Sequence, residues 1–320
     1  MNYQNGNQET TKNSYRVLIV LVIGLAAFSS AMNDLNDLQR FSFQAQNLVA
    51  AWSDIVVPTA NASAPVPAVA CVEKFVVQNA KHSDQFQWSG QVAPGNAIEI
   101  KGINGGITAE PGSGSGVQVV ATKRSRRSDV DSVHIKVEQH AGGVTICALY
   151  PNEDGEYPDG CNGDKDGDNS VRNNDVSVDF TVRVPAQVTF VGKTINGGID
   201  ATSLASNVIA KTINGSIKIS TTGYAEAATI NGEISARFND ANWTKALSFK
   251  TINGEINLDL PANLSTSVDA QTMNGAINSD FPLEVTNLKG RKSVRGVIGS
   301  GGRELVLKTL NGSINLRIAG

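Results

Sequence analysis

This 320-residue chain is poor in the side chains that most often hold metals or cofactors, with three cysteines, three histidines and 6% aromatic residues. His82, His134 and His140 lack metal-ligand spacing, and no Cys/His pattern typical of a zinc site is present. The Gly-x-Ser-x-Gly motif of a serine nucleophile and a glycine-rich phosphate-binding loop are also missing. We therefore expect a protein that is not an enzyme, with no catalytic residue and no cofactor.

The chain has no excess of positive charge, with 27 Lys and Arg against 30 Asp and Glu and a net charge of −3. Nucleic-acid-binding surfaces are strongly basic, so nucleic acid is excluded as a partner. One basic cluster does occur at residues 123–127. It could meet anionic lipid or polysaccharide, or it could be an ordinary charged loop balanced by Asp129 and Asp131.

Long hydrophobic runs are missing too. The longest, residues 17–28, has twelve residues, against the ~20 that cross a bilayer. Ser29 and Ala31 follow it at the −3 and −1 places of a small-residue cleavage site. This pattern predicts a secretory signal peptide at residues 1–31 and an exported protein, in the periplasm or at the cell surface. An uncleaved anchor is the alternative, and it would be the only membrane attachment that we expect.

Residues 33–56 are predicted to form an amphipathic helix. Its apolar positions are spaced by three and four residues: Leu38, Phe41, Ala45, Leu48, Trp52 and Ile55. The helix could be a short coiled coil or a surface attachment, or it could cap an open end of the β-structure that follows. Residues 57–70 are rich in Ala and Pro and indicate an extended linker, so we assign residues 32–71 to helix and linker.

What the chain does have is a repeated phrase, Thr-Ile-Asn-Gly-x-Ile. Its six copies have their Asn at positions 196, 214, 231, 253, 274 and 311, and an outlying copy has Asn104. The intervals are 18, 17, 22, 21 and 37 residues, and the last one divides if residues 293–298 are a degenerate copy. Such spacing indicates an all-β, single-stranded parallel β-solenoid, in which equivalent residues stack in columns. We expect it to be right-handed.

Two alternatives accompany the solenoid. Asn-Gly between apolar residues is also the strongest short signal for a β-hairpin, and seven hairpins would form an antiparallel meander. In a solenoid, columns of Asn and Thr could hydrogen-bond from coil to coil, whereas otherwise each Asn bonds only its own turn. We favour the solenoid because hairpins do not require a constant phrase.

Further motifs accompany the repeat: Val-Arg-Val-Pro-Ala at 182–186, Leu-Pro-Ala at 260–262 and Ile-Gly-Ser-Gly-Gly at 298–302. With the repeated phrase, they resemble the DUF4097 family, a bacterial adhesin-like domain with β-solenoid character. The resemblance covers roughly residues 72–320, which we take as one domain. It implies the fold and a location in the cell envelope, and it implies no chemistry.

An acidic loop follows Pro151. Asp164, Asp166, Asp168 and Asp175 fall at positions 1, 3, 5 and 12 of a calcium-binding loop, although position 6 is not Gly and position 12 is not Glu. These four residues are a weak Ca²⁺ candidate, and a solvated acidic loop is the alternative.

Cys147 and Cys161 bracket the loop, and export favours a disulfide between them. Pairing of Cys147 with Cys71 stays open.

Glu233 and Glu255 are the only acidic neighbours in the repeat columns, and they would lie about 4.8 Å apart in stacked coils. Together they could hold a cation or share a proton, or they could extend into solvent.

We expect an adhesin-like, non-enzymatic envelope protein that binds surface polysaccharide or another envelope protein. The alternatives are a self-assembling homo-oligomeric scaffold and a carbohydrate-active β-helix enzyme.

Overall fold

The computed structural model describes residues 82–319, apart from residues 153, 162–172, 241–242, 244, 284 and 289–290. In this part of the chain the protein is all-β, with strands in two sheets and one short 3-10 helix, η1 (Val130–Ser132). The predicted signal peptide, amphipathic helix and linker lie outside the described residues. None of the helices within the described residues is long and apolar enough to cross a membrane.

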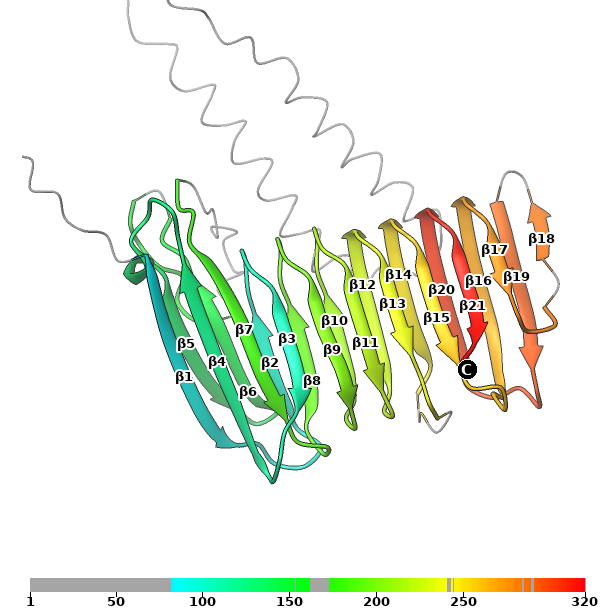
Figure 1. Cartoon of the computed structure of the whole chain (residues 1–320), viewed down its shortest axis with the longest axis horizontal. Helices are drawn as coiled ribbons and strands as arrows, with labels where there is room; N and C mark the ends of the chain where they lie inside the picture. The colour runs from blue at the N-terminus through cyan, green and yellow to red at the C-terminus, as the bar shows by residue number, and fades with distance from the viewer. Residues whose placement is uncertain are drawn as a thin grey trace, which may run out of the picture.

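The two sheets face each other along the long axis of the molecule (Figure 1). Sheet A contains, in spatial order, β1 (Ser83–Gln91), β4 (Gly116–Arg124), β7 (Ser177–Val184), β3 (Ile107–Pro111), β9 (Ile199–Leu204), β11 (Ile217–Thr221), β13 (Ile234–Arg237), β15 (Ile256–Leu260), β21 (Ile314–Ile318) and β17 (Ile277–Ser279). Sheet B contains β18 (Val285–Leu288), β19 (Arg291–Ile298), β16 (Thr266–Asn274), β20 (Glu304–Asn311), β14 (Leu247–Asn253), β12 (Ala225–Asn231), β10 (Val208–Lys211), β8 (Thr189–Lys193), β2 (Ala97–Lys101), β6 (Gly143–Leu149) and β5 (His134–His140).

The repeated phrase marks the place where the chain passes from sheet B to sheet A. In each copy the Asn-Gly corner follows a strand of sheet B and precedes a strand of sheet A, and we call such a strand pair a coil. Neighbouring coils pair in parallel, as in β10 with β12 and in β11 with β13. The predicted parallel all-β class is therefore confirmed, and the corners do not form hairpins.

The core lies between the sheets and is built by the inward positions of each strand. Along β15 the side chains alternate between buried and half-buried, as the period of two requires. Ile217, Ile234, Ile256 and Ile314 stand in register on successive strands, and each is at most 1% exposed. One coil has too few apolar side chains to be covered alone, so the core forms only when coils stack.

The Asn side chains of the corners form a continuous hydrogen-bonded ladder along one edge of the stack. Asn196 Nδ2 donates to Asn104 Oδ1 at 2.9 Å, and Asn214 Nδ2 donates to Asn196 Oδ1 at 2.9 Å. The same bond continues through Asn231, Asn253, Asn311 and Asn274 at 2.7–2.8 Å. The expectation of columns that bond from coil to coil is confirmed, and it explains why the phrase is constant.

Threonine and glycine have a second structural reason to recur. The buried hydroxyl of Thr251 donates to the carbonyl oxygen of Gly232 in the next coil at 3.0 Å, and the other five copies make the equivalent bond. A Cβ atom on Gly215 would overlap the carbonyl oxygen of Gly197. Glycine is thus required mainly by the close approach of stacked corners.

The coils do not stack in chain order. The last coil, β20 and β21, lies between the coil β14–β15 and the coil β16–β17, and Figure 1 shows the chain ending inside the stack. The proposed degenerate copy at residues 293–298 was wrong. These residues belong to β19, which forms a hairpin with β18 and pairs antiparallel with β16. A hairpin inserted before the last coil therefore accounts for the interval of 37 residues.

Antiparallel strands close most ends of the two sheets. At the N-terminal end β4 pairs antiparallel with β1 and β7 in sheet A, and β5 pairs antiparallel with β6 in sheet B. At the other end the β18–β19 hairpin closes sheet B, and the three-residue strand β17 ends sheet A. Short or antiparallel end strands hinder pairing with another molecule.

Candidate binding site

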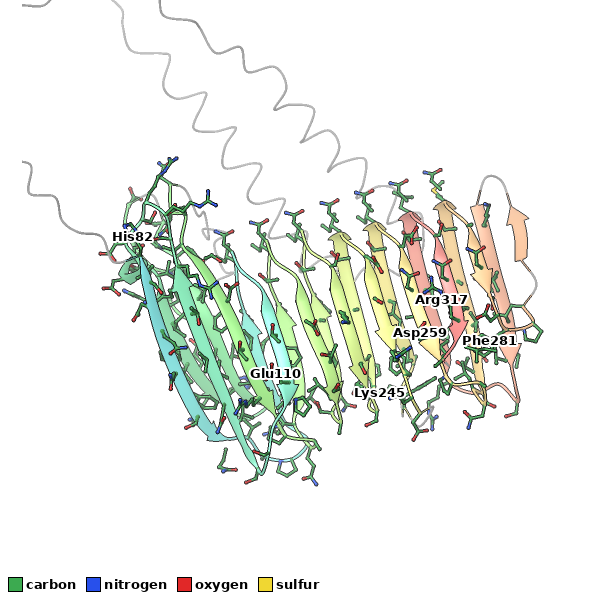
Figure 2. The ribbon with its side chains drawn as sticks, viewed as in Figure 1. His82, Glu110, Lys245, Asp259, Phe281 and Arg317 are labelled. Atoms are coloured by element: carbon green, nitrogen blue, oxygen red, sulfur yellow. A yellow bond between two sulfur atoms is a disulfide. The ribbon has the colours of Figure 1, made fainter. Side chains whose placement is uncertain are left out.

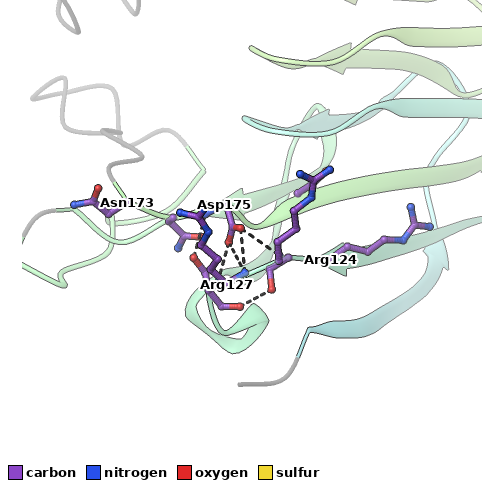
Figure 3. Close-up of a pocket in the computed structure, with 9 residues that line it drawn as sticks. Arg124, Arg127, Asn173 and Asp175 are labelled. Carbon is purple, nitrogen blue, oxygen red and sulfur yellow. Dashed lines mark hydrogen bonds between the residues drawn. The ribbon is translucent and has the colours of Figure 1, made fainter. Parts of the chain in front are cut away.

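The basic cluster of the sequence forms one side of a surface cavity at the N-terminal end of the stack (Figure 3). The cavity has a volume of about 740 Å³, and residues 124–128, which follow β4, line it together with residues 173–175 and 177, which precede or begin β7. The cluster and its surroundings come from segments about 50 residues apart in the chain.

Asp175 holds the backbone of the basic loop. Its carboxylate accepts hydrogen bonds from the backbone N–H groups of Arg126 at 3.2 Å, Arg127 at 3.1 Å and Ser128 at 2.9 Å (Figure 3). The backbone N–H of Asp175 donates in turn to the Ser128 hydroxyl at 3.1 Å. These bonds, those from Ser128 first, lower the pKa of Asp175 to about 2, because they favour the charged carboxylate. The loop is thereby fixed while the arginine side chains remain outside these bonds.

Two of the four basic side chains in the cluster have acidic partners. Lys123 is buried and pairs with Asp84 at 3.0 Å and with Asp131 at 3.8 Å. Arg124 is exposed and pairs with Asp179 at 3.2 Å. The expectation that Asp131 balances the cluster is thus correct for Lys123.

Arg126 and Arg127 are both exposed, and within the described part of the chain no carboxylate forms an ion pair with either guanidinium group. Asp129, the second acid expected to balance them, instead accepts the backbone N–H of Asp131 at 3.0 Å and caps η1. A guanidinium fork binds carboxylate, sulfate or phosphate oxygens in pairs. The cavity therefore presents two exposed arginines on a fixed backbone, and their side chains are suited to an anionic ligand.

The calcium hypothesis involves three residues outside the described part of the chain and one residue inside it. Asp164, Asp166 and Asp168 lie outside the described residues. Asp175 lies within them, and its carboxylate is occupied by the three N–H groups of the basic loop. The Ca²⁺ site stays a prediction. The role that Asp175 does play was missed, because its partners lie 47 to 49 residues away and no local pattern links them.

The disulfide between Cys147 and Cys161 is present, with the two Cα atoms 5.6 Å apart. Cys147 lies in β6, and both cysteines pack with Leu149 in a small buried cluster. The alternative partner, Cys71, lies outside the described residues. The bond ties the acidic loop, at Cys161, to sheet B.

The two neighbouring glutamates do stand in adjacent coils, since Ile234 N–H donates to the Glu255 carbonyl oxygen at 2.9 Å. Both side chains are exposed, and Glu233 Oε1 accepts a hydrogen bond from Asn257 Nδ2 at 2.8 Å. Asn257 begins a second ladder on sheet A that continues through Asn315 and Asn278 at 2.7–2.8 Å. Glu233 thus takes part in the hydrogen bonding of a structural column, and these hydrogen bonds were not predicted.

The three histidines occupy surface positions in or next to strands of the N-terminal end. His134 stacks on Tyr157 with ring centroids 4.1 Å apart, and the ring of His140 lies 3.1 Å from the Thr145 hydroxyl. His82 lies 3.4 Å from the Ser125 hydroxyl. Among the residues that can be described, no three His, Cys, Asp or Glu side chains gather as a metal site would require.

Comparison with known proteins finds a family model that matches part of the chain. The model of the family Toastrack DUF4097 matches residues 164–317, which confirms the resemblance drawn from the repeated phrase. Of solved structures, a putative cell adhesion protein of Clostridium sporogenes is similar at 11% identity and a TM-score of 0.39, covering 73% of this chain and 99% of that one. A putative adhesin of Bacteroides fragilis is similar at 12% identity and a TM-score of 0.24, covering 72% and 96%. No curated protein matches the chain.

Proposed function

Because residues 164–317 match the model of the Toastrack DUF4097 family, we propose that this protein is an exported, non-enzymatic, adhesin-like β-solenoid of the cell envelope. Its ligand is an acidic surface polysaccharide, which binds at the cavity of Arg126 and Arg127. Export rests on the predicted signal peptide, and the disulfide supports it because such bonds persist in oxidising compartments.

The observation that carries the binding role is the arrangement around Asp175. This carboxylate accepts hydrogen bonds from the backbone N–H groups of Arg126 and Arg127, so it fixes the loop without pairing with either guanidinium group. A fixed loop loses little conformational entropy when a ligand binds, which favours affinity. The carboxylates or sulfates of an acidic glycan match the paired donors of arginine.

The closed ends of the sheets favour a binding role over a scaffold assembled end to end. β1 and β4, β5 and β6, and β18 and β19 are all antiparallel pairs at ends of the stack. Only the three-residue strand β17 continues the parallel order to an edge. Growth of a fibre by parallel coil addition would have to displace these pairs.

The proposal is tested by calorimetric titration with an acidic polysaccharide, such as polygalacturonate, and with neutral dextran as a reference. We expect salt-sensitive binding of the acidic polymer alone, and loss of that binding in the double variant Arg126→Ser/Arg127→Ser. The matched control removes two exposed arginines of sheet A, Arg183→Ser/Arg317→Ser, and Figure 2 shows Arg317 far from the cavity. Equal loss in both double variants, or no binding by the unchanged protein, would contradict the proposed site.

Location is tested separately by protease treatment of intact and of opened cells. Digestion on intact cells would support a surface adhesin, whereas protection until the envelope is opened would support a periplasmic protein. Retention in the cytoplasmic fraction would overturn the proposed export. This result does not depend on the identity of the ligand.

A further inference from the structure

An apolar column runs along the outer face of sheet B. It is formed by the residue between Thr and Asn of each repeated phrase: Ile195, Ile213, Ile230, Ile252, Leu310 and Met273. In β12 and β14, which continue through the phrase, the Thr points inward and donates to the glycine carbonyl of the neighbouring coil, so the following side chain points outward. The column forms a hydrophobic cluster separate from the core between the sheets.

These outward side chains are nevertheless buried. Ile213 is 2% exposed, Ile252 1% and Leu310 5%. The described residues that pack in the cluster are members of the column itself and Ala228, all from the same face of sheet B. Neighbouring strands cover the flanks of an outward side chain, and they leave its tip to be covered by something else. Because these exposed fractions are those of the single chain, a cover would come from residues of the same chain beyond the described ones.

The lysines beside the column are also partly or largely shielded from solvent. Lys193, Lys211, Lys250 and Lys308 lie two residues before the apolar position in their strands. Lys211 and Lys308 are 9% and 5% exposed. The pKa of Lys250 is lowered, first because burial penalises the charged ammonium group and then because Lys308 stands near it. Within sheet B, Lys193 pairs with Glu99 at 2.7 Å and Lys211 pairs with Glu226 at 3.2 Å, so lysines and acids alternate on this face.

One stretch of the chain outside the described residues has both the length and the apolar spacing to form this cover. Six strands at about 4.8 Å spacing extend about 24 Å. Residues 162–172 have a single large apolar side chain, Val171, and the other undescribed internal segments have three residues or fewer. The residues that precede β1 include the amphipathic segment 33–56, whose apolar stripe also has six members.

The two periodicities match. Apolar residues separated alternately by three and four positions advance about 5.2 Å along a helix for each side chain, close to the strand spacing of about 4.8 Å. A helix lying across the strands therefore places one apolar side chain on each strand. The segment also carries Asp34, Asp37 and Asp54 against one basic residue, Arg40, which complements the lysines.

We propose that residues 33–56 lie as a helix across the outer face of sheet B, with their apolar stripe on the column from Ile195 to Met273. The inference is independent of the proposed ligand and of the arginine cavity. It gives the segment a place along the stack, and neither a coiled coil nor an end cap is then needed.

Cysteine cross-linking of the full chain tests this arrangement. Leu48 lies near the middle of the stripe and Ile230 near the middle of the column, so the two positions are opposite each other in one helix direction and one strand spacing apart in the other. In a Cys71→Ser background, Leu48→Cys with Ile230→Cys is expected to form a disulfide within the monomer on mild oxidation. The matched control is Ala50→Cys with Ile230→Cys, because residue 50 lies on the opposite side of the helix.

A monomer cross-linked through position 48 and not through position 50 supports the proposal. Cross-linked dimers alone would show that a second copy covers the column, and equal or no reaction at both positions would show that the segment lies elsewhere. Either result overturns the proposal.

Hydrogen exchange provides an independent test. We expect Ile252→Asp to remove amide protection from residues 38–55 while β12 and β15 stay protected, and Ser235→Asp, on the outer face of sheet A, to leave all three unchanged. Unchanged protection of 38–55 in Ile252→Asp would also overturn it.

Discussion

Asn311 Nδ2 donates a 2.7 Å hydrogen bond to Asn253 Oδ1, although 58 residues separate the two in the chain. The bond joins the last coil to one that the chain left two coils earlier. It belongs to the ladder that aligns the corners from Asn104 to Asn274. The ladder therefore follows the spatial order of the coils, which differs from their order in the sequence.

The ladder contributes measurably to stability. Asn253→Ala removes one donated and one accepted hydrogen bond, so we expect a loss of about 1–2 kcal/mol in the free energy of unfolding. Urea denaturation followed by circular dichroism measures this. Asn239→Ala, at an exposed residue outside the ladder, is the control. Equal midpoints for the two variants would show that the ladder is without energetic effect.

The corner glycines cannot be replaced. Gly215→Ala places a methyl group against the Gly197 carbonyl, and we expect it to destabilise the fold by about 2–3 kcal/mol or to reduce soluble yield. Gly106→Ala is the matched control, because the nearest atom to a Cβ there lies at an ordinary 3.5 Å. A similar denaturation midpoint for both alanine variants would refute the close-approach argument.

The buried threonine hydroxyls satisfy carbonyl groups that would otherwise be unpaired. Thr251→Val keeps the shape and leaves the Gly232 carbonyl without its donor, at an expected cost of about 1–3 kcal/mol. Thr251→Ser keeps the hydroxyl and should lose less stability. Thermal denaturation of the two variants compares them directly, and a valine variant as stable as the parent protein would exclude a stabilising role for this bond.

The disulfide should stabilise the N-terminal end of the stack. Cys147 and Cys161 are 14 residues apart, and closing such a loop is worth about 3 kcal/mol in the chain-entropy model. We expect Cys161→Ser to lower the melting temperature in the absence of reductant, and Cys71→Ser to leave it unchanged. A lower melting temperature for Cys71→Ser would instead indicate the pairing of Cys147 with Cys71.

Asp175 should make the basic loop sensitive to acid. Its pKa is lowered from an ordinary value of 3.8 to about 2 in the folded protein, so the folded state binds this proton less readily than the unfolded state does. The stabilisation is therefore complete above about pH 4 and is lost as the pH falls toward 2. We expect the stability difference between the parent protein and Asp175→Asn to shrink over this range, as measured by denaturation at each pH. A difference that is independent of pH would contradict the assigned hydrogen bonds.

Much of the coil architecture could be predicted because its causes are local. The alternation of buried and exposed positions sets each strand, and the constant Thr-x-Asn-Gly corner sets the columns. The order of the coils could not be predicted, because coils with the same corner phrase offer nearly the same edges to any neighbour. Residues 293–298 misled for a related reason. Their apolar positions fit a corner as well as they fit the continuous strand β19.

The binding site was only half predictable. The basic cluster is visible in the sequence, and its pairing with Asp131 follows from proximity in the chain. Asp175 was instead assigned to calcium, because its spacing from Asp164 is local and its contacts with Arg126 and Ser128 are not. Nonlocal hydrogen bonds between loops leave no periodic trace in a sequence.

The inserted position of the last coil has a consequence for how the chain reaches its native state. During synthesis or export from the N-terminus, β16 emerges before β20, and the only partner then available on that side is β14. Both strands bear the corner phrase, so they can join in a register like that of every other neighbouring pair. The completed chain must open this premature junction, or keep it from forming, before β20 enters. We therefore expect folding to finish only after residues 304–318 have emerged, because the regular corner phrase that stabilises the stack also permits a premature pairing of β14 with β16.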